Sequence, residues 1–310
     1  MTVKVSLICP VYKVADYLPD LMTSLLAGVN SEQVEVIFVD DCCPEQSIVV
    51  CEQFLNEHAE LIKFQYKVIK QPVNKGQAAA RNTALAVAQG EYIGFIDSDD
   101  AISPYYWETL SSYVVDAQYD IIEFTFEEFK DGLPVSIKTD TSELSSSNLN
   151  PFYYDFFVWT RLYKRKIVEG LAFPEGMIYE DIFYNIHAFS KAKNTVRLST
   201  SLVYYRKREG STTALRTSEY SQLLINLVDA THKTIDAFSE QRELLSLLQK
   251  KCFVLMLKGL KIVNKDERKK YYQLCLPHLL FVKQLAKKYG TTTKSKVLYL
   301  IGCVICRAFT

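Results

Sequence analysis

Apolar segments and helix-like segments alternate over the first hundred residues, and this alternation constrains the fold more than any other feature of the sequence. The strand-like segments are residues 3–9, 34–39, 64–69 and 92–96, and the helix-like segments between them are residues 18–28, 46–58 and 77–88. Strands that alternate with helices form a parallel sheet, because right-handed crossovers bring each new strand beside an earlier one. We therefore expect an α/β fold with a doubly wound, mostly parallel sheet.

The middle of the chain is less regular. Its patterns predict a helix over residues 104–117 and strands over residues 120–126 and 196–205. Residues 139–150 are rich in Ser, Thr and Asn, which predicts a mobile surface loop.

The last part of the chain predicts a smaller α-helical C-terminal region, with helical spacing over residues 223–238, 244–263 and 271–289. We place the boundary near Leu215, which gives domains of residues 1–214 and 215–310. The apolar segment 297–306 is too short to span a bilayer. We expect it to pack on a neighbouring helix or on a second copy of the chain, and contact with a membrane surface is the alternative.

Composition excludes some functions. The chain has 36 Lys plus Arg and 36 Asp plus Glu, so its overall charge does not favour nucleic acid as a partner. Residues 3–8 lack the basic start and the cleavage site of a signal peptide, so we expect a cytoplasmic protein, with the inner face of the cytoplasmic membrane as a peripheral site. The eight cysteines show no disulfide framework.

Polar residues gather where the predicted strands end. Tyr12 follows the first strand, Asp40 and Asp41 end the second, and residues 97–100 (Asp-Ser-Asp-Asp) follow the fourth. Ligands bind beyond the carboxyl strand ends of such sheets, so these groups are expected to share one crevice. Adjacent carboxylates repel each other, and Mg²⁺ or Mn²⁺ would compensate them while binding a phosphate. The alternative is a solvated turn before a helix capped by Ser103.

Known phosphate-binding signatures are absent from the sequence. No Gly-x-Gly-x-x-Gly follows the first strand, and there is no Gly-x-x-x-x-Gly-Lys-Ser/Thr, which argues against a dinucleotide oxidoreductase and a phosphate-loop NTPase. Transfer of a group from a nucleotide diphosphate would also need a base. Glu180 and Asp181 are the best candidates, although acids at the start of a helix also have a structural explanation.

The motifs together resemble the family 2 glycosyltransferases, which have the GT-A fold with a Rossmann-like nucleotide-binding half. The resemblance covers about residues 3–211 and rests on segments in the same order and spacing: Val5–Tyr12, Val39–Asp41, Asn74–Gly76, Ala80–Asn82, Gly90–Asp100 and Tyr179–Asp181. It implies inverting transfer of a sugar from a nucleotide-sugar, most often a UDP-sugar, to a hydroxyl. The acceptor would be a glycan or lipid-linked molecule in the synthesis of surface polysaccharide, capsule or lipo-oligosaccharide.

The resemblance also implies roles for individual residues. The nucleotide-sugar would be bound by residues near the strand ends and the third helix: Pro10, Val11, Tyr12, Asp40, Asp41, Lys75, Gly76, Asp97 and Ser98. Asp99, with Asp97, would bind the Mn²⁺ or Mg²⁺. Asp181 would be the general base, with Glu180 as its neighbour or substitute. Trp159 resembles an aromatic residue near the acceptor, and a core tryptophan is the alternative.

The chain departs from the family pattern at two turns. Lys13 stands where the family often has Asn, and Cys42-Cys43-Pro44 replaces the commoner Gly-Ser type of turn. The basic residues 206–208 form either a loop that closes on the diphosphate or a solvated turn. Two other functions stay open: a sugar nucleotidyltransferase, which should carry a glycine-rich loop after the first strand, and an inactive family member that serves as a binding subunit.

Overall fold

The structure, a computed structural model, describes residues 2–134, 142–146 and 156–208 and a few single residues between 226 and 240. Two compact units make up the chain: Met1–Gly176 with His187–Arg208, and Met177–Ile186 with Glu209–Thr310. The predicted boundary near Leu215 and the apolar segment 297–306 lie outside the described residues, and both stay predictions. Of the predicted C-terminal helices, only the first contains described residues, and those from Asn226 to Ala237 are helical.

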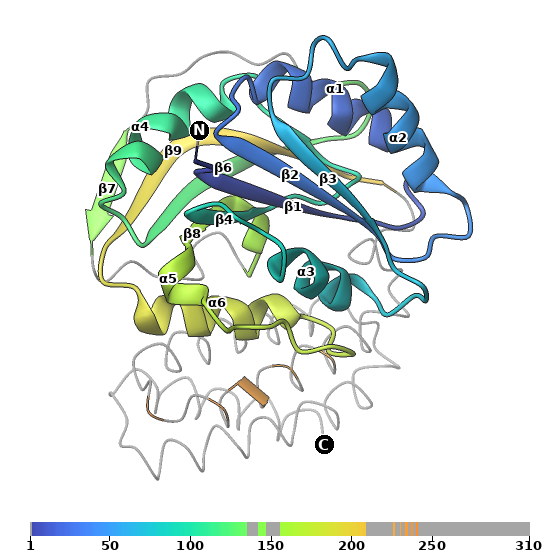
Figure 1. The fold of residues 1–310 in the computed structure, drawn as a ribbon. Helices are drawn as coiled ribbons and strands as arrows, with labels where there is room; N and C mark the ends of the chain where they lie inside the picture. Colours follow the sequence, from blue (N-terminus) through green and yellow to red (C-terminus); the bar gives the residue numbers. More distant parts are fainter. Residues whose placement is uncertain are drawn as a thin grey trace, which may run out of the picture. The chain divides into compact units, whose positions relative to one another are not determined.

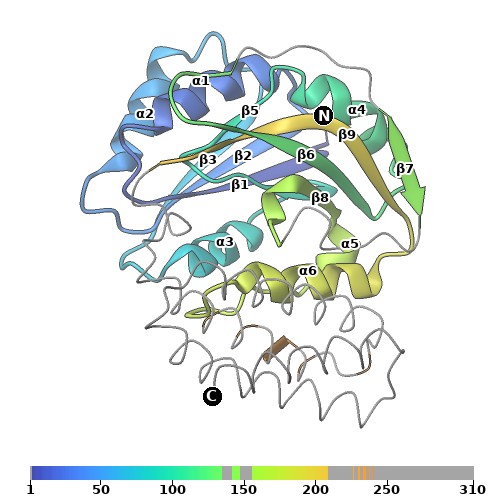
Figure 2. The ribbon, with the colours of Figure 1, turned by 180° about the vertical axis from the view of Figure 1, so that it is seen from behind.

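The first unit begins with the predicted alternation of strands and helices. The elements are β1 (Val5–Val11), α1 (Leu18–Gly28), β2 (Val34–Asp40), α2 (Ser47–Glu57), β3 (Gln65–Lys70), α3 (Gln77–Leu85) and β4 (Tyr92–Phe95). The four strands are parallel in the order β3-β2-β1-β4, which confirms the predicted doubly wound half. Helices α1 and α2 cover one face of the sheet and α3 covers the other (Figures 1 and 2).

The second part of the sheet is mixed. It is built from β5 (Ala101–Ile102), α4 (Tyr106–Asp116), β6 (Ile121–Phe129), β7 (Glu143–Ser146), a 3₁₀ turn (Val158–Thr160), β8 (Arg161–Lys164), α5 (Arg165–Val168), α6 (Glu180–Lys191) and β9 (Thr195–Arg206). Within the described residues, nine strands form one sheet, in the order β3-β2-β1-β4-β8-β6-β9-β5 with β7 paired to β9. Strand β8 runs antiparallel to both β4 and β6, so the parallel order ends at β4.

One prediction for this region is wrong in part. Residues 139–150 were expected to be a loop, but the structure places β7 at Glu143–Ser146, antiparallel to β9. The Ser-rich sequence gives no sign of this strand. The strand forms because its backbone hydrogen-bonds to β9, which lies about fifty residues further along the chain.

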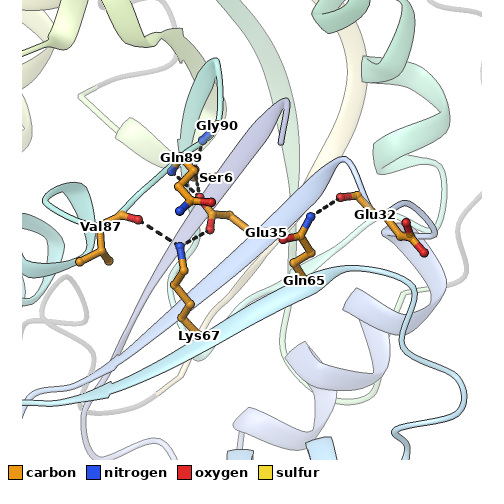
Figure 3. A network of polar contacts seen from close by, with 8 residues as sticks. All are labelled: Ser6, Glu32, Glu35, Gln65, Lys67, Val87, Gln89 and Gly90. Carbon is orange, nitrogen blue, oxygen red and sulfur yellow. Dashed lines mark hydrogen bonds and ion pairs between the residues drawn. The ribbon is translucent and has the colours of Figure 1, made fainter. Parts of the chain in front are cut away.

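A buried carboxylate joins the amino ends of the parallel strands (Figure 3). Glu35 on β2 is 1% exposed and accepts hydrogen bonds from Ser6 Oγ on β1 (2.6 Å) and from Lys67 Nζ on β3 (2.7 Å). The backbone N–H of Gln89 also donates to Glu35, and that of Gly90 donates to Ser6. Burial raises the pKa of Glu35, but the hydrogen bonds from Lys67, Ser6 and Gln89 outweigh burial and lower it overall. This network therefore holds the strands in register at the end opposite to the predicted crevice.

In the part of the chain that the structure describes, no helix combines the length and the apolar character needed to cross a bilayer. The cytoplasmic or peripheral location stays a prediction.

Candidate functional site

The carboxyl ends of β1, β2 and β4 meet at one edge of the sheet. Val11 lies opposite Asp40 in the parallel pair of β1 and β2, and the N–H of Asp41 donates to the carbonyl of Val11 (3.1 Å). On the other side of β1, the N–H of Ile96 donates to the carbonyl of Ile8 (3.0 Å), which brings the acids that follow β4 to the same edge. The order of the strands thus brings the polar residues that follow β1, β2 and β4 to one edge of the sheet, as predicted.

Asp41 connects the end of β2 to the start of α3. Its carboxylate is 2% exposed and accepts the N–H groups of Lys75 and Gly76, both at 2.8 Å. Gly76 has φ +86°, a conformation that side chains rarely adopt, so this turn needs glycine. Asp40, also buried, accepts the N–H of Cys43 at 2.9 Å. Backbone donors therefore stabilise both buried carboxylates.

Of the residues that end β1, Pro10 and Val11 are buried, whereas the Tyr12 side chain is 39% exposed. Lys13 lies with its Nζ 5.6 Å from the centre of the Tyr12 ring. Tyr12 thus presents an aromatic face beside Asp40 and Asp41, which are predicted to bind the base and ribose.

Asp97 is held by two residues of α3. Its Oδ1 accepts Gln77 Nε2 (2.8 Å) and forms an ion pair with Arg81 NH2 (3.1 Å). Arg81 is 2% exposed, and its guanidinium lies 5.8 Å from the ring centre of Phe95 and 5.2 Å from that of Phe173. Sequence reasoning missed both partners, although their spacing of four residues on one helix face was a usable signal.

Asp99 has a cationic partner from the end of β9. Its Oδ2 lies 2.6 Å from Arg208 Nε, and the two side chains are 20% and 23% exposed. Asp97 and Asp99 offer oxygen atoms only, which suits Mg²⁺ or Mn²⁺. Among the described residues, no group of three or more His, Cys, Asp or Glu side chains is arranged to hold a metal. A metal at Asp99 would therefore need further ligands, such as phosphate oxygens and water, and would have to replace Arg208.

Asp100 and Ser98 are buried beside these acids. Asp100 Oδ1 accepts the N–H of Arg206 (2.8 Å), and its Oδ2 has no hydrogen-bond partner among the described residues. Burial, together with the charges of Asp97 and Asp99, raises the pKa of Asp100 well above its usual value. The surroundings of Asp100 thus stabilise its neutral form relative to its charged form.

The basic residues 206–208, at the end of β9 and just after it, have three different environments. Arg206 is 5% exposed: it pairs with Asp20 and donates from Nε to the carbonyl of Asp99 (2.8 Å). Lys207 pairs with Glu128 at the surface (3.0 Å). The predicted solvated turn therefore describes Lys207 alone, since Arg206 belongs to the scaffold and Arg208 faces Asp99.

Trp159 is a core residue in the structure. It is 2% exposed and lies against the rings of Phe157 (centroids 4.6 Å apart), Phe126 (5.0 Å) and Tyr205 (5.3 Å). A ring this buried offers little surface to a sugar, so the structure favours the core alternative over the acceptor contact.

Glu180 and Asp181 form the first turn of α6, as predicted. Tyr179 before them has φ +67°, which turns the chain sharply into the helix. Asn185 donates from Nδ2 to the carbonyl of Asp181 (2.9 Å). Both acids belong to the second compact unit, and their role as a base stays a prediction.

Comparisons with known proteins identify the class. The model of the family described as glycosyl transferase family 2 matches residues 6–172, which is more than half of the chain. The chain belongs to this family.

Relatives support the same assignment. The chain is 30% identical to the uncharacterized glycosyltransferase EpsJ of Bacillus subtilis over 226 residues, which cover 68% of this chain and 63% of EpsJ. It is 29% identical to the glycosyltransferase GlyA of Streptococcus pneumoniae over 258 residues, which cover 78% of this chain but only 35% of GlyA. The chain thus spans about a third of one relative and less than two thirds of the other.

Solved structures share the fold. The structure of Staphylococcus aureus TarS 1–349 in complex with UDP-GlcNAc has a TM-score of 0.68 at 22% identity and covers 89% of this chain and 80% of TarS 1–349. The mannosyltransferase PcManGT of Pyrobaculum calidifontis in complex with GDP-Man and Mn²⁺ has a TM-score of 0.59 at 15% identity, over 98% of this chain and 81% of that one. The fold is therefore GT-A, as the sequence motifs predicted.

Proposed function

We propose that this chain is an inverting glycosyltransferase that moves a sugar from a UDP-sugar to a hydroxyl of a glycan or lipid-linked acceptor. The observation that carries the proposal is the set of buried or partly buried, hydrogen-bonded acids at the ends of β2 and β4, next to the exposed Tyr12. One relative, TarS of S. aureus, is named as a poly(ribitol-phosphate) β-N-acetylglucosaminyltransferase, which supports a role in surface polysaccharide synthesis. Family membership favours this function over a sugar nucleotidyltransferase.

The donor base would bind at the ends of β1 and β2. Each Asp41 oxygen already accepts one backbone N–H, and a carboxylate oxygen can accept a second hydrogen bond. The N3–H of uracil or a ribose hydroxyl could supply it. Tyr12 would cover one side of the base or ribose, and the N–H groups at the start of α3, after Lys75 and Gly76, would face the phosphates.

The diphosphate would bind near Asp97 and Asp99. When bound, Mn²⁺ or Mg²⁺ would offset the negative charge of the leaving nucleoside diphosphate. Gln77 and Arg81 hold Asp97 in place for this role, and Asp99 would exchange Arg208 for the metal. The released guanidinium could then pair with phosphate oxygens, for which arginine is well suited.

Asp181, with Glu180 as the alternative, would accept the acceptor proton. As the proton leaves the hydroxyl, its oxygen forms a bond to the anomeric carbon on the face opposite to the diphosphate. The bond from that carbon to the phosphate oxygen breaks, and the nucleoside diphosphate leaves with the electron pair. A single displacement of this kind inverts the anomeric centre.

Calorimetry with UDP, GDP and dTDP, with and without Mn²⁺, tests the donor class. We expect UDP to bind most tightly, and Mn²⁺ to strengthen its binding. The sugar is then found by screening UDP-sugars for slow hydrolysis, which needs no acceptor. If no nucleotide binds in the presence of Mn²⁺, the proposal is wrong, whereas binding without any hydrolysis or transfer would indicate an inactive binding subunit.

Asp181→Asn tests the base. Because the substitution removes the proton acceptor but leaves the ends of β1, β2 and β4 untouched, UDP and Mn²⁺ should bind as in the unmodified protein. Hydrolysis or transfer should fall at least about 100-fold. Full activity in Asp181→Asn would contradict the assignment, and Glu180→Gln would then be the next variant to measure.

A further inference from the structure

The turn after β2 carries adjacent cysteines in very different surroundings. Cys42 is exposed, and its Sγ lies 3.7 Å from the carbonyl of Pro72. Cys43 is 8% exposed, and its Sγ accepts the backbone N–H of Lys13 at 3.1 Å. The same sulfur lies 3.4 Å from Ser47 Oγ at the start of α2.

Ser47 extends the connection. Its hydroxyl oxygen accepts the N–H of Val14 at 3.0 Å, and Ser47 is fully buried. Together, Lys13, Val14, Cys43 and Ser47 form a set of contacts that we call the thiol bridge. It joins the turn after β1 to the turn after β2, across about thirty residues of sequence.

The turn after β1 needs such support. Lys13 has φ +54°, in the left-handed region that residues with a side chain seldom adopt. A conformation of this kind persists only where its surroundings hold it in place. The sulfur of Cys43 does so from one side, while the N–H of Cys43 donates to Asp40 Oδ1 at 2.9 Å. One residue therefore fixes the backbone next to Tyr12 and one of the two acids beside it.

Burial is the main influence on the pKa of the other two buried thiols of the described residues, Cys9 and Cys51. Burial raises the pKa of Cys51 to about 12 and also raises that of Cys9. For Cys43, burial acts in the same direction, but hydrogen bonds from Ser47, Lys13 and Glu45 outweigh it and lower the pKa. The contacts thus mark this sulfur as a hydrogen-bond acceptor, whereas Cys9 and Cys51 are apolar core residues.

We propose that Cys43 is a positioning residue for the donor nucleotide. Its sulfur holds the turn of residues 12–14 in the conformation that places Tyr12 beside Asp40 and Asp41, so the base site is formed before the donor arrives. This proposal rests on the proposed function, because it assumes that the nucleotide binds at these strand ends. It goes beyond that function by naming the residue that shapes the site without contacting the donor.

Hydrogen exchange at the amide of Lys13 tests the bridge itself. In Cys43→Ala the acceptor is lost, so the Lys13 amide should exchange at least about fivefold faster, as expected for one neutral hydrogen bond. In Cys43→Ser the hydroxyl oxygen can accept the same N–H, and exchange should return toward the rate of the unmodified protein. Cys42→Ser is the matched control at the neighbouring position, and it should leave the rate unchanged.

Calorimetry with UDP and Mn²⁺ tests the consequence for the donor. We expect Cys43→Ala to weaken UDP binding about fivefold, with Cys43→Ser and Cys42→Ser close to the unmodified protein. The measurements are made well below the melting temperature of each variant, so that a general loss of stability does not produce the effect. Recovery of UDP affinity in Cys43→Ser would then show that the loss in Cys43→Ala comes from the missing hydrogen bond and not from the smaller side-chain volume.

Specific results would overturn the proposal. An unchanged Lys13 exchange rate in Cys43→Ala would show that the sulfur does not hold the turn. Faster exchange with unchanged UDP affinity would show that the turn does not position the donor. If the unmodified protein binds no nucleotide at all, the proposed function has failed and the donor role fails with it, while Lys13 exchange still decides whether the thiol bridge exists.

Discussion

Lys13 and Cys42, which stand at the two turns where the chain departs from the family pattern, share a backbone conformation. Each has φ +54°, in the left-handed region that glycine adopts without strain and asparagine tolerates better than most residues. The family often has Asn at the first of these positions and commonly has Gly at the second. At both positions the chain therefore has a residue that suits this conformation less well than the residue the family often has.

Cys42→Gly should stabilise the protein. The substitution removes the steric strain of a side chain at φ +54°, which costs about 1–2 kcal/mol, but it adds freedom to the unfolded chain. The net gain in the free energy of unfolding should be about 0.5–1 kcal/mol. Urea unfolding measures it, with Cys42→Ser as the control that keeps the strain. A lower unfolding midpoint for Cys42→Gly than for Cys42→Ser would contradict this reasoning.

Asp99→Asn should weaken the binding of UDP in the presence of Mn²⁺ by at least about tenfold, because an amide oxygen is a poorer ligand for a hard cation than a carboxylate. Binding measured without the metal should change little. The fold should survive, since the pair of Asp99 with Arg208 is partly exposed and the carbonyl that accepts Arg206 remains. Calorimetry with and without Mn²⁺ checks this, and an unchanged effect of Mn²⁺ would remove Asp99 from the metal site.

At the scale of elements, the sequence predicts the parallel strands well and the antiparallel ones poorly. Strands β1, β2 and β4 are buried throughout and mostly apolar, and each lies between clear turn signals, so local pattern suffices to find them. Strands β5 and β7 have only two and four residues, and they exist because they pair with β9. Pairing between distant segments leaves no local signal in strands this short.

The same contrast applies to the candidate site. The acids could be placed from sequence because they follow apolar strands whose ends meet in any sheet of this class. Their partners could not: Arg81 reaches Asp97 from a helix, and Arg208 reaches Asp99 from the segment just after β9, 109 residues along the chain. Which charge pairs with which acid depends on tertiary packing, and the sequence shows only that both kinds of charge are present.

The network around Glu35 predicts a dependence of stability on pH. The pKa of Glu35 is lower in the folded protein than in the unfolded chain, so its contribution is present above the unfolded value of about 4.3 and is lost as the pH falls through the folded value. At neutral pH, Glu35→Gln should lower the free energy of unfolding by about 2 kcal/mol.

Urea unfolding between about pH 7 and about pH 3 measures this effect. The difference between the unmodified protein and Glu35→Gln should shrink as the solution becomes acidic, since the buried carboxyl is then neutral in both states. Glu91→Gln is a suitable control, because Glu91 is 35% exposed and its pair with Lys4 is worth little. A difference that stays constant over this range would show that Glu35 does not titrate with unfolding.

On the scale of the first unit, the last strand is tied back to the first helix and to the acids after β4. Arg206 makes this connection: its guanidinium pairs with Asp20 of α1 and donates to the carbonyls of Asp99 and Lys130. The aromatic ring of Phe129 lies 4.3 Å from the guanidinium. Segments up to 186 residues apart therefore meet at one side chain, and the backbone of the acid turn, residues 97–100, is supported by the last strand of the sheet.

Arg206→Met tests that dependence. The methionine keeps much of the volume but leaves buried carbonyl groups without a donor, so the free energy of unfolding should fall by about 2–4 kcal/mol. Lys207→Met is the matched control on the next residue, and it should change stability by no more than about 0.5 kcal/mol because its pair with Glu128 is exposed. The Mn²⁺-dependent affinity for UDP should also fall in Arg206→Met, since the backbone of Asp99 loses its support. Equal stability of the two variants would mean that Arg206 is no more than a surface charge, and that the acid turn is positioned by β4 alone.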